Sequence, residues 1–451
     1  MREIIEYVCT QGRRSFHFLK NYASELRDIT AVEPIKLKSY QKDALKNLLD
    51  YLYEKNSFYN GLLNQVGYNV EQEFTWDIFQ RIPLFSKEML RKKKDGLLCV
   101  PIEEILHVHT STGTSGGESI SIMYTINDLY GSDLYPQWGK LFYLNATDVV
   151  AVALPYEMSS AGQAFQRVAQ IGYQAVVLPV GKGGAYSDPT KAIELMKEFK
   201  CTVLISSPSY VIELMKAAEN CGFNMKEDIL VEQIWLTGEG CSNKFRNRIE
   251  SKWNADARFY YGSLECGALG IECGKKDGYH IPDSHVYLEI INPDTGETLE
   301  DGEIGEIVVT TLLKEGTPLV RYRTQDIGFI EHFRCECGIP LKKLYLRGRK
   351  IDQIIIDGKE YAPIYIEEML MNIKEVGDNY FINVREDMAE VVIELASNCI
   401  YRDGLEEIIS SQLEYRCGMP NQIKIVDKIP CDGKKVRRVN YINGKEESDD
   451  N

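Results

Sequence analysis

Apolar side chains recur at helical spacing in the first hundred residues. Between residues 39 and 63, Leu45, Leu48, Leu49 and Leu52 follow the i, i+3, i+4, i+7 pattern of one helix face. A stripe of this kind packs into a core. The pattern therefore predicts a mostly helical segment over about residues 1–100.

From about residue 105, short apolar runs alternate with helical patterns. The helical patterns KAIELMKEFK and SYVIELMKAAENCG lie between runs that each lead into a loop. Such alternation is typical of βαβ units on a mostly parallel sheet, where loops at the carboxyl ends of the strands build the site. The predicted buried strands are DVVAVALPY (148–156), YQAVVLPVG (173–181), CTVLISSPS (201–209) and EQIWLTGEG (232–240).

The pattern changes again after residue 285. Residues 286–312 alternate apolar and polar side chains around Asp-Gly and Thr-Gly turns, which predicts antiparallel strands. The last hundred residues predict a hairpin at 351–361, a helix with Pro363 in its first turn, and a strand at 389–397.

These patterns together predict an α/β fold of two domains. Residues 1–346 form a large N-terminal domain of parallel-rich sheets with helices and a β-rich subdomain. Residues 353–451 form a small α+β C-terminal domain. The segment 347–352 is the predicted boundary between them.

Composition narrows the class of protein. The 451 residues carry a net charge of -15, which argues against nucleic acid as the partner. No apolar run approaches the roughly 18 residues that span a bilayer, and the start lacks the apolar part of a signal peptide. The 12 cysteines are then reduced thiols or metal ligands. We expect a cytoplasmic protein that binds neither a membrane nor nucleic acid.

One loop, HTSTGTSGGES at residues 109–119, is crowded with hydroxyl groups and glycines. The glycines let the backbone approach a ligand and turn several N–H groups inward, and the hydroxyls add donors. This favours an anion cradle for a polyphosphate. The loop is not a Walker A motif, because Glu118 stands where a basic residue is needed. By itself it could equally be a flexible surface loop.

Five further motifs follow this loop in order, and the whole set resembles the adenylate-forming (ANL) superfamily of acyl-CoA synthetases. The resemblance extends from about residue 40 to 440. It is strongest to the phenylacetate–CoA ligase branch, which includes the coenzyme F390 synthetases and CapK-like proteins. The motifs are WLTGEG (235–240), RFYYGSLECG (258–267), TPLVRYRTQDIG (317–328), LRGRKID (346–352) and IPCDGKKVRRV (429–439).

The resemblance implies a reaction, a set of site residues, and a hinge at 347–352 about which the small C-terminal domain is mobile. A carboxylate attacks the α-phosphate of ATP to give acyl-AMP and pyrophosphate, and the acyl group then passes to the thiol of CoA. Glu265 would bind Mg²⁺, and Asp326 and Arg349 would contact the ribose. The residues expected at the phosphates are Thr110, Ser111, Thr112, Gly113, Thr114, Ser115 and Gly116; those at the adenine are Gly238, Glu239, Tyr261, Gly262 and Ser263; those at the acyl group are Tyr156, Ser160, Ala161, Tyr260 and Leu264.

The last motif should supply the lysine that bridges the carboxylate and the α-phosphate during adenylation. Counting from Pro430 as in the branch gives Lys435, which we favour, whereas the first lysine after the glycine is Lys434.

Three positions depart from the family pattern. Gly117–Glu118 replaces a lysine of the phosphate loop, Gln325 replaces the glycine before Asp326, and Ile351 occupies the usual hinge position. These departures bear on ATP affinity and on hinge behaviour.

Four further residues have the chemistry of a metal site. Cys273 and His280, then Cys335 and Cys337, offer three thiols and one imidazole. Such a closed set suits tetrahedral Zn²⁺ in a structural role. The same spacing occurs in several members of the branch, so the resemblance also implies structural zinc.

The sequence therefore predicts an ATP-dependent ligase that joins a small carboxylic acid, by analogy a phenylacetate-like aryl acid, to CoA. One alternative keeps the adenylation but uses another acceptor, such as a carrier-protein thiol, an amine or a cofactor. A second alternative is a non-catalytic nucleotide-binding relative. Relatives often form homodimers, so a homodimer is a further expectation.

Overall fold

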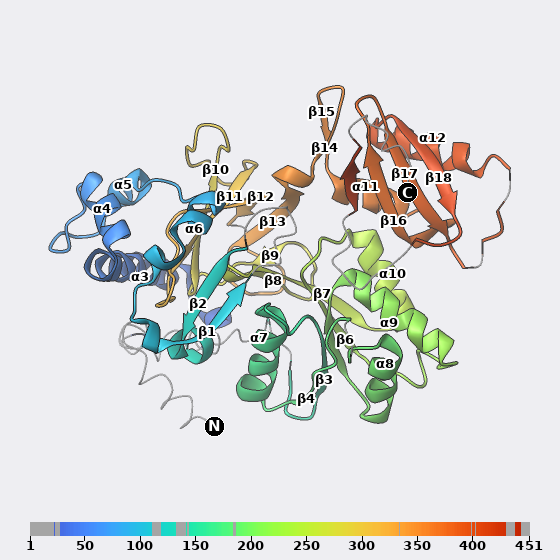
Figure 1. The fold of residues 1–451 in the computed structure, drawn as a ribbon, viewed down its shortest axis with the longest axis horizontal. Coiled ribbons are helices and arrows are strands. Elements are labelled where there is room, and N and C mark those ends of the chain that lie inside the picture. Colours follow the sequence, from blue (N-terminus) through green and yellow to red (C-terminus); the bar gives the residue numbers. More distant parts are fainter. Residues whose placement is uncertain are drawn as a thin grey trace, which may run out of the picture.

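The computed structural model describes residues 22, 28–110, 119–131, 141, 144–183, 186–332, 334–397, 399–401, 403–429 and 438–442. Its centre is an eleven-stranded sheet with the strand order β10-β11-β12-β13-β9-β8-β7-β6-β5-β3-β4. The mixed α/β architecture predicted from the sequence is confirmed (Figure 1).

One half of this sheet is parallel. Its strands are β3 (Val149–Ala153), β4 (Val176–Leu178), β5 (Val203–Ser206), β6 (Gln233–Leu236) and β7 (Asp256–Ser263). The four predicted buried strands are all present, and α8 (Pro189–Glu198) and α9 (Pro208–Asn220) are the two predicted helices between them. The remaining helices of this half are α7 (Ala161–Arg167) and α10 (Asn243–Trp253).

The other half of the sheet is antiparallel, as the alternating pattern after residue 285 predicted. Strand β7 joins the two halves, because it runs parallel to β6 and antiparallel to β8. The antiparallel strands are β8 (Gly267–Glu272), β9 (Tyr279–His280), β10 (Val286–Ile291), β11 (Gly305–Thr311), β12 (Tyr322–Glu331) and β13 (Lys343–Arg349). A separate hairpin, β1 (Ile105–Thr110) with β2 (Ser121–Thr125), precedes the sheet in sequence.

The N-terminal helices bury the predicted apolar stripe. Leu45, Leu48, Leu49 and Leu52 are fully buried on α3. The predicted helical segment 39–63 spans two helices, because the chain leaves the helical conformation at Asn56, whose side chain caps the next helix. The helices are α3 (Pro34–Lys55), α4 (Ser57–Gln65), α5 (Trp76–Arg81) and α6 (Lys87–Lys93).

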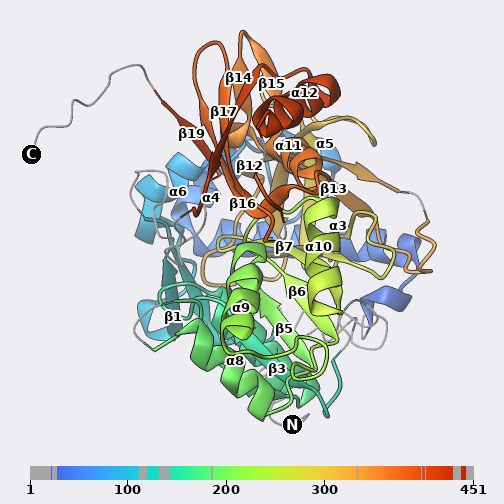
Figure 2. The same ribbon diagram turned by 90° about the vertical axis from the view of Figure 1, so that its right-hand side faces the viewer.

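The last hundred residues build a second, four-stranded sheet of order β18-β17-β16-β19. Figures 1 and 2 show it at one end of the molecule, apart from the large sheet, with α10 reaching toward it. The predicted hairpin, helix and strand are all present. The elements are β14 (Ile354–Ile356), β15 (Lys359–Tyr361), α11 (Pro363–Leu370), β16 (Val376–Val384), β17 (Ala389–Leu395), α12 (Leu405–Cys417), β18 (Asn421–Val426) and β19 (Val439–Tyr441).

The predicted hinge, 347–352, covers the end of β13 and the turn before β14. Its role as a hinge stays a prediction. Within the described part of the chain, no helix has both the length and the apolar character needed to cross a membrane.

Candidate active site

The residues at the carboxyl ends of β6 and β7 are presented by two tight turns. Gly238, directly after β6, has a φ of +84°, a conformation that L side chains rarely adopt. At Gly262, an added Cβ would lie 2.5 Å from the carbonyl oxygen of Gly267 across the turn. Glycine therefore avoids backbone strain at the first place and a backbone clash at the second, and the second turn carries Glu265 between β7 and β8.

Three predicted residues from three separate motifs form one cluster. The Tyr261 hydroxyl donates to Asp326 at 2.5 Å, and the Arg349 Nε lies 3.3 Å from the other carboxylate oxygen of Asp326. Asp326 and Arg349 are register partners on β12 and β13. Burial, together with the charge of Asp326, holds the pKa of Tyr261 well above its usual value, so its hydroxyl stays a donor at neutral pH.

The Glu265 carboxylate lies in a basic and phenolic environment. It is nearly buried, with the Tyr322 hydroxyl at 3.4 Å and the Lys87 Nζ at 3.6 Å. The Lys314 ammonium donates to its backbone carbonyl at 2.9 Å. Lys87 opens α6, and no sequence motif marked it, because one lysine in an amphipathic segment carries no pattern. It adds positive charge to a site whose phosphate loop has no lysine.

A cleft of about 380 Å³ opens beside these residues. Each cation on its wall pairs with a carboxylate: Arg323 with Glu306, Lys87 with Glu265 and Lys350 with Asp294. The Lys87 and Lys350 side chains remain 30% and 55% exposed. The basic lining suits an anionic ligand. The lining residues are Ser86, Lys87, Glu306, Arg323, Gln325 and Lys350.

Gln325 departs from the family glycine at a place where the backbone favours glycine. Its φ is +66°, in the left-handed region, and its N–H donates to the Glu306 carboxylate at 3.1 Å. The next residue is Asp326. The left-handed bend before Asp326 turns the aspartate into the site. Glycine adopts this bend without strain, which explains why the family pattern has glycine here.

The Glu239 side chain is engaged within the protein. Its carboxylate binds the Lys182 Nζ at 3.0 Å and the Ser209 hydroxyl at 2.9 Å. Burial alone would raise the pKa of Glu239, but Lys182 and Ser209 outweigh it and hold that pKa below its usual value. An ionised Glu239 thus ties the loop after β6 to the start of α9, and any contact with adenine would fall to its backbone.

The predicted acyl-pocket residues lie on two segments. Tyr156, Ser160 and Ala161 belong to the loop from β3 into α7, and Tyr260 and Leu264 belong to β7 and the turn after it. An added Cβ at Gly162 would lie 3.0 Å from the Tyr156 ring, so glycine allows the first turn of α7 to pack against that ring.

Aromatic rings pack around Tyr260. Phe165 of α7 contacts Tyr260 edge-to-face with ring centroids 4.8 Å apart, and Trp235 lies 6.4 Å from Phe165. Burial raises the pKa of Tyr156 to about 12, so its hydroxyl remains protonated at neutral pH. An apolar wall of this kind suits an aromatic ligand.

Several predicted residues lie outside the described part of the chain: Ser111, Thr112, Gly113, Thr114, Ser115, Gly116, Lys434 and Lys435. Thr110 is the last residue of β1, and its N–H donates to the Met158 carbonyl at 2.9 Å. The Tyr124 hydroxyl of β2 donates to the Leu264 carbonyl at 3.0 Å. The β1–β2 hairpin is thereby joined to the loops that carry the acyl-pocket residues.

The three cysteines and the histidine of the predicted metal site meet in space. The ligand atoms of Cys273, His280, Cys335 and Cys337 all lie within 4.8 Å of one another. The sulfurs of Cys273 and Cys335 are 3.8 Å apart, the spacing of two thiolates at about 2.3 Å from a tetrahedral Zn²⁺. The His280 Nε2 faces Cys337 at 3.3 Å, while its Nδ1 lies 3.4 Å from the Leu341 carbonyl. The donor set fits zinc.

Comparisons with known proteins identify relatives of this chain. The family model of the AMP-binding enzymes matches residues 111–312. The phenylacetate–coenzyme A ligase of Thermus thermophilus is 30% identical over 84% of this chain and 85% of its own length. That of Pseudomonas putida is 28% identical over 86% of this chain and 90% of its own.

Solved structures share the fold. A 2-hydroxyisobutyryl-CoA ligase in the postadenylation state, complexed with an acyl-AMP, superposes with a TM-score of 0.82 at 20% identity, covering 92% of this chain and 90% of that one. The same ligase in the thioesterification state, with acyl-AMP and CoA, gives a TM-score of 0.66 at 20% identity, covering 92% and 91%.

Proposed function

The chain belongs to the phenylacetate–coenzyme A ligase family of AMP-binding enzymes, and from that membership we propose that it joins an aryl acid such as phenylacetate to CoA. The reaction has two steps. The acid carboxylate attacks the α-phosphate of ATP and pyrophosphate leaves. The CoA thiol then attacks the acyl carbonyl and AMP leaves.

The observation that carries this proposal is the cluster of Tyr261, Asp326 and Arg349, which lies near Glu265 beside the basic cleft. The Asp326 carboxylate, held from two sides, is suited to accept the two ribose hydroxyls. The first step brings two anions together, so catalysis rests on positioning and on charge neutralisation.

The phosphate end of ATP is proposed to lie along Thr110–Gly116 and the basic cleft. Glu265 would hold Mg²⁺, which neutralises phosphate charge when bound. Lys87, 3.6 Å from that carboxylate, supplies a fixed positive charge on the same side. Its position compensates for the lysine that the phosphate loop lacks.

The choice of an aryl acid is supported by Phe165, Trp235 and Tyr260, whose rings pack together beside the loop of Tyr156. An aromatic acid would bury its ring against this wall and gain edge-to-face contacts. The names of the two bacterial relatives point to the same substrate class.

A structural zinc ion is a second proposal, carried by the Cys273–His280–Cys335–Cys337 set. When bound, it would join β8 and β9 to the segment that leads into β13. We also place the enzyme in the cytoplasm, where ATP and CoA are supplied and thiols stay reduced.

The test is acid-dependent pyrophosphate release over a panel of aryl, arylacetic and aliphatic acids, with and without CoA. We expect release with arylacetic acids and formation of the CoA thioester. Release with an acid but no thioester would indicate another acceptor, such as a carrier-protein thiol. No release with any acid would contradict the ligase.

A further inference from the structure

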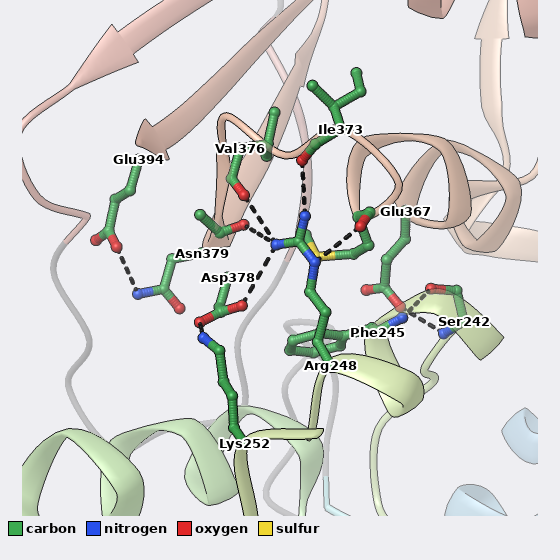
Figure 3. A network of polar contacts seen from close by, with 12 residues as sticks. Ser242, Phe245, Arg248, Lys252, Glu367, Ile373, Val376, Asp378, Asn379 and Glu394 are labelled. Carbon is green, nitrogen blue, oxygen red and sulfur yellow. Dashed lines mark hydrogen bonds and ion pairs between the residues drawn. The ribbon is translucent and has the colours of Figure 1, made fainter. Parts of the chain in front are cut away.

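The two domains meet where α10 of the large domain lies against α11 of the small one (Figure 3). Arg248 of α10 reaches the carbonyls that follow α11. Its Nε donates to Met371 at 2.8 Å, its Nη2 to Ile373 at 2.8 Å, and its Nη1 to Val376 at 2.8 Å. Met371 is the C-cap of α11, and Val376 opens β16, so a cation from the other domain holds the turn that joins α11 to β16.

The same guanidinium makes two weaker contacts at the start of β16. Its Nη1 lies 3.1 Å from the Gly377 carbonyl and 3.4 Å from the Asp378 carboxylate. Lys252, one turn further along α10, also pairs with Asp378. All three nitrogens of Arg248 are thus used, and every acceptor belongs to the small domain.

The small domain also contacts the start of α10. Glu367 of α11 accepts from the backbone N–H of Ser242 at 2.5 Å, and Glu368 accepts from the N–H of Lys244 at 2.7 Å. These N–H groups lie at the first turn of α10, where a helix favours negative charge. The capping is reciprocal, with carboxylates of α11 at the start of α10 and a cation of α10 at the end of α11.

Glu367 is held in place from inside its own domain. Its second oxygen accepts from the Tyr380 hydroxyl at 2.9 Å and pairs with Arg438. The Arg438 guanidinium stacks between Tyr380 and Phe245, with ring centroids 4.5 and 5.0 Å away. Because Phe245 belongs to α10, this packing also crosses between the domains.

We propose that this reciprocal capping holds the small domain in the arrangement used for adenylation, with Arg248 as its principal positioning residue. The arrangement superposes better on a ligase in its postadenylation state, at a TM-score of 0.82, than on the same ligase in its thioesterification state, at 0.66. Rotation of the small domain for the second step would break all of the Arg248 contacts together. The inference rests on the proposed function, because it assigns the contacts to one of the two half-reactions.

The first experiment measures the half-reactions separately for wild type, Arg248→Ala, Arg248→Lys and Lys216→Ala. We expect Arg248→Ala to lower acid-dependent pyrophosphate release about tenfold, the loss expected when a charged donor leaves its acceptors unpaired. Thioester formation from preformed acyl-AMP and CoA should be unchanged. Pyrophosphate release by Arg248→Lys should lie between that of wild type and that of Arg248→Ala, because one ammonium cannot reach all the acceptors of a planar guanidinium.

Lys216→Ala is the matched control. Lys216 also crosses between the domains, to Glu394 at 3.5 Å, but its side chain is 44% exposed, and surface pairs contribute little. An equal loss in both half-reactions of Arg248→Ala, or no loss in adenylation, would overturn the proposal. If Arg248→Ala does not fold, Glu368→Gln serves instead, with an expected loss of about two- to threefold in adenylation only.

The second experiment does not depend on activity. The amides of Ser242 and Lys244 donate across the interface, so they report its opening by hydrogen exchange. We expect faster exchange at these amides in Arg248→Ala and wild-type exchange in Lys216→Ala. Unchanged exchange would refute the reciprocal capping even if no acid releases pyrophosphate. Faster exchange in a protein without ligase activity would refute only the proposed function.

Discussion

At the scale of single residues, the site differs from its family pattern in ways that the structure explains. Gln325 occupies a left-handed backbone position where relatives use glycine, and the phosphate loop has no lysine while Lys87 stands beside Glu265. At Gln325, a side chain is tolerated at a cost in backbone strain. At Glu265, Lys87 supplies a positive charge from a different part of the chain.

We predict that Lys87→Ala lowers kcat/KM for ATP by about 10- to 100-fold, because it removes one fixed charge from the phosphate end of the site. Lys92→Ala is the control on the same helix, since Lys92 pairs with Glu88 at the surface. Steady-state kinetics at varied ATP concentration measure kcat/KM for both variants. Equal activity of the two variants would contradict the role of Lys87.

We predict that Gln325→Gly raises stability by about 1 kcal/mol, because glycine adopts the left-handed conformation without the clash of a Cβ. Gln325→Ala keeps the Cβ and should give no gain. Thermal unfolding of the three proteins under one condition provides the comparison. A higher midpoint for Gln325→Ala as well would mean that the amide, not the backbone, is the source of strain.

At the scale of elements, β7 connects the parallel and antiparallel halves of the sheet and carries Tyr260, Tyr261 and Gly262 to the site. The cysteine and histidine set lies on the next strands of the antiparallel half, with Cys273 directly after β8 and His280 on β9. Because β9 is only two residues long, it contributes few ladder bonds of its own. A metal ion at His280 would therefore strengthen the short interior strand between β8 and β13, which its own ladder bonds hold weakly.

We predict that Cys337→Ser reduces bound zinc to well below one ion per chain and lowers the thermal midpoint by roughly 5 °C, because metal binding contributes to folding. Cys399→Ser, a free cysteine outside the set, should change neither value. Elemental analysis of protein purified without chelator and a melting curve measure the effect. A wild-type protein that is stable and contains no metal would rule out the zinc site.

At the scale of the whole molecule, the proposed reaction would use residues from both domains. Glu265, Asp326 and Tyr261 are brought together within the large domain, whereas the proposed adenylation lysine follows β18 of the small one. The interface of α10 and α11 sets how the two parts are placed. Catalysis of the first step therefore depends on a contact that includes none of the reacting groups.

We predict that Lys435→Ala lowers adenylation by about a hundredfold or more and leaves thioester formation from preformed acyl-AMP largely intact, because the lysine stabilises charge only in the first step. Lys434→Ala is the neighbouring control. Pyrophosphate release and a separate thioester assay distinguish the steps. The reverse outcome, with Lys434→Ala inactive in adenylation, would move the role to Lys434.

Much of the fold could be predicted from sequence because its signals are local. Apolar runs of four or five residues predicted β3, β5 and β6, and helical spacing predicted the buried face of Leu45–Leu52. The break at Asn56 was missed, since a single capping side chain hardly alters the apolar period. Asp326, Tyr261 and Arg349 were found through motifs whose residues must stand at fixed spacing.

The elements, the family and the side chains in recognisable motifs can all be inferred from the amino-acid order. Which groups become neighbours depends on how the chain packs. Lys87 meets Glu265 across 178 positions of sequence, and Lys182 binds the Glu239 that a motif had assigned to the ligand. Arg248 binds main-chain carbonyls, which every residue carries and no sequence pattern marks. Only the packing of the chain determines such partners, because every residue carries the same carbonyl group and only its position is specific.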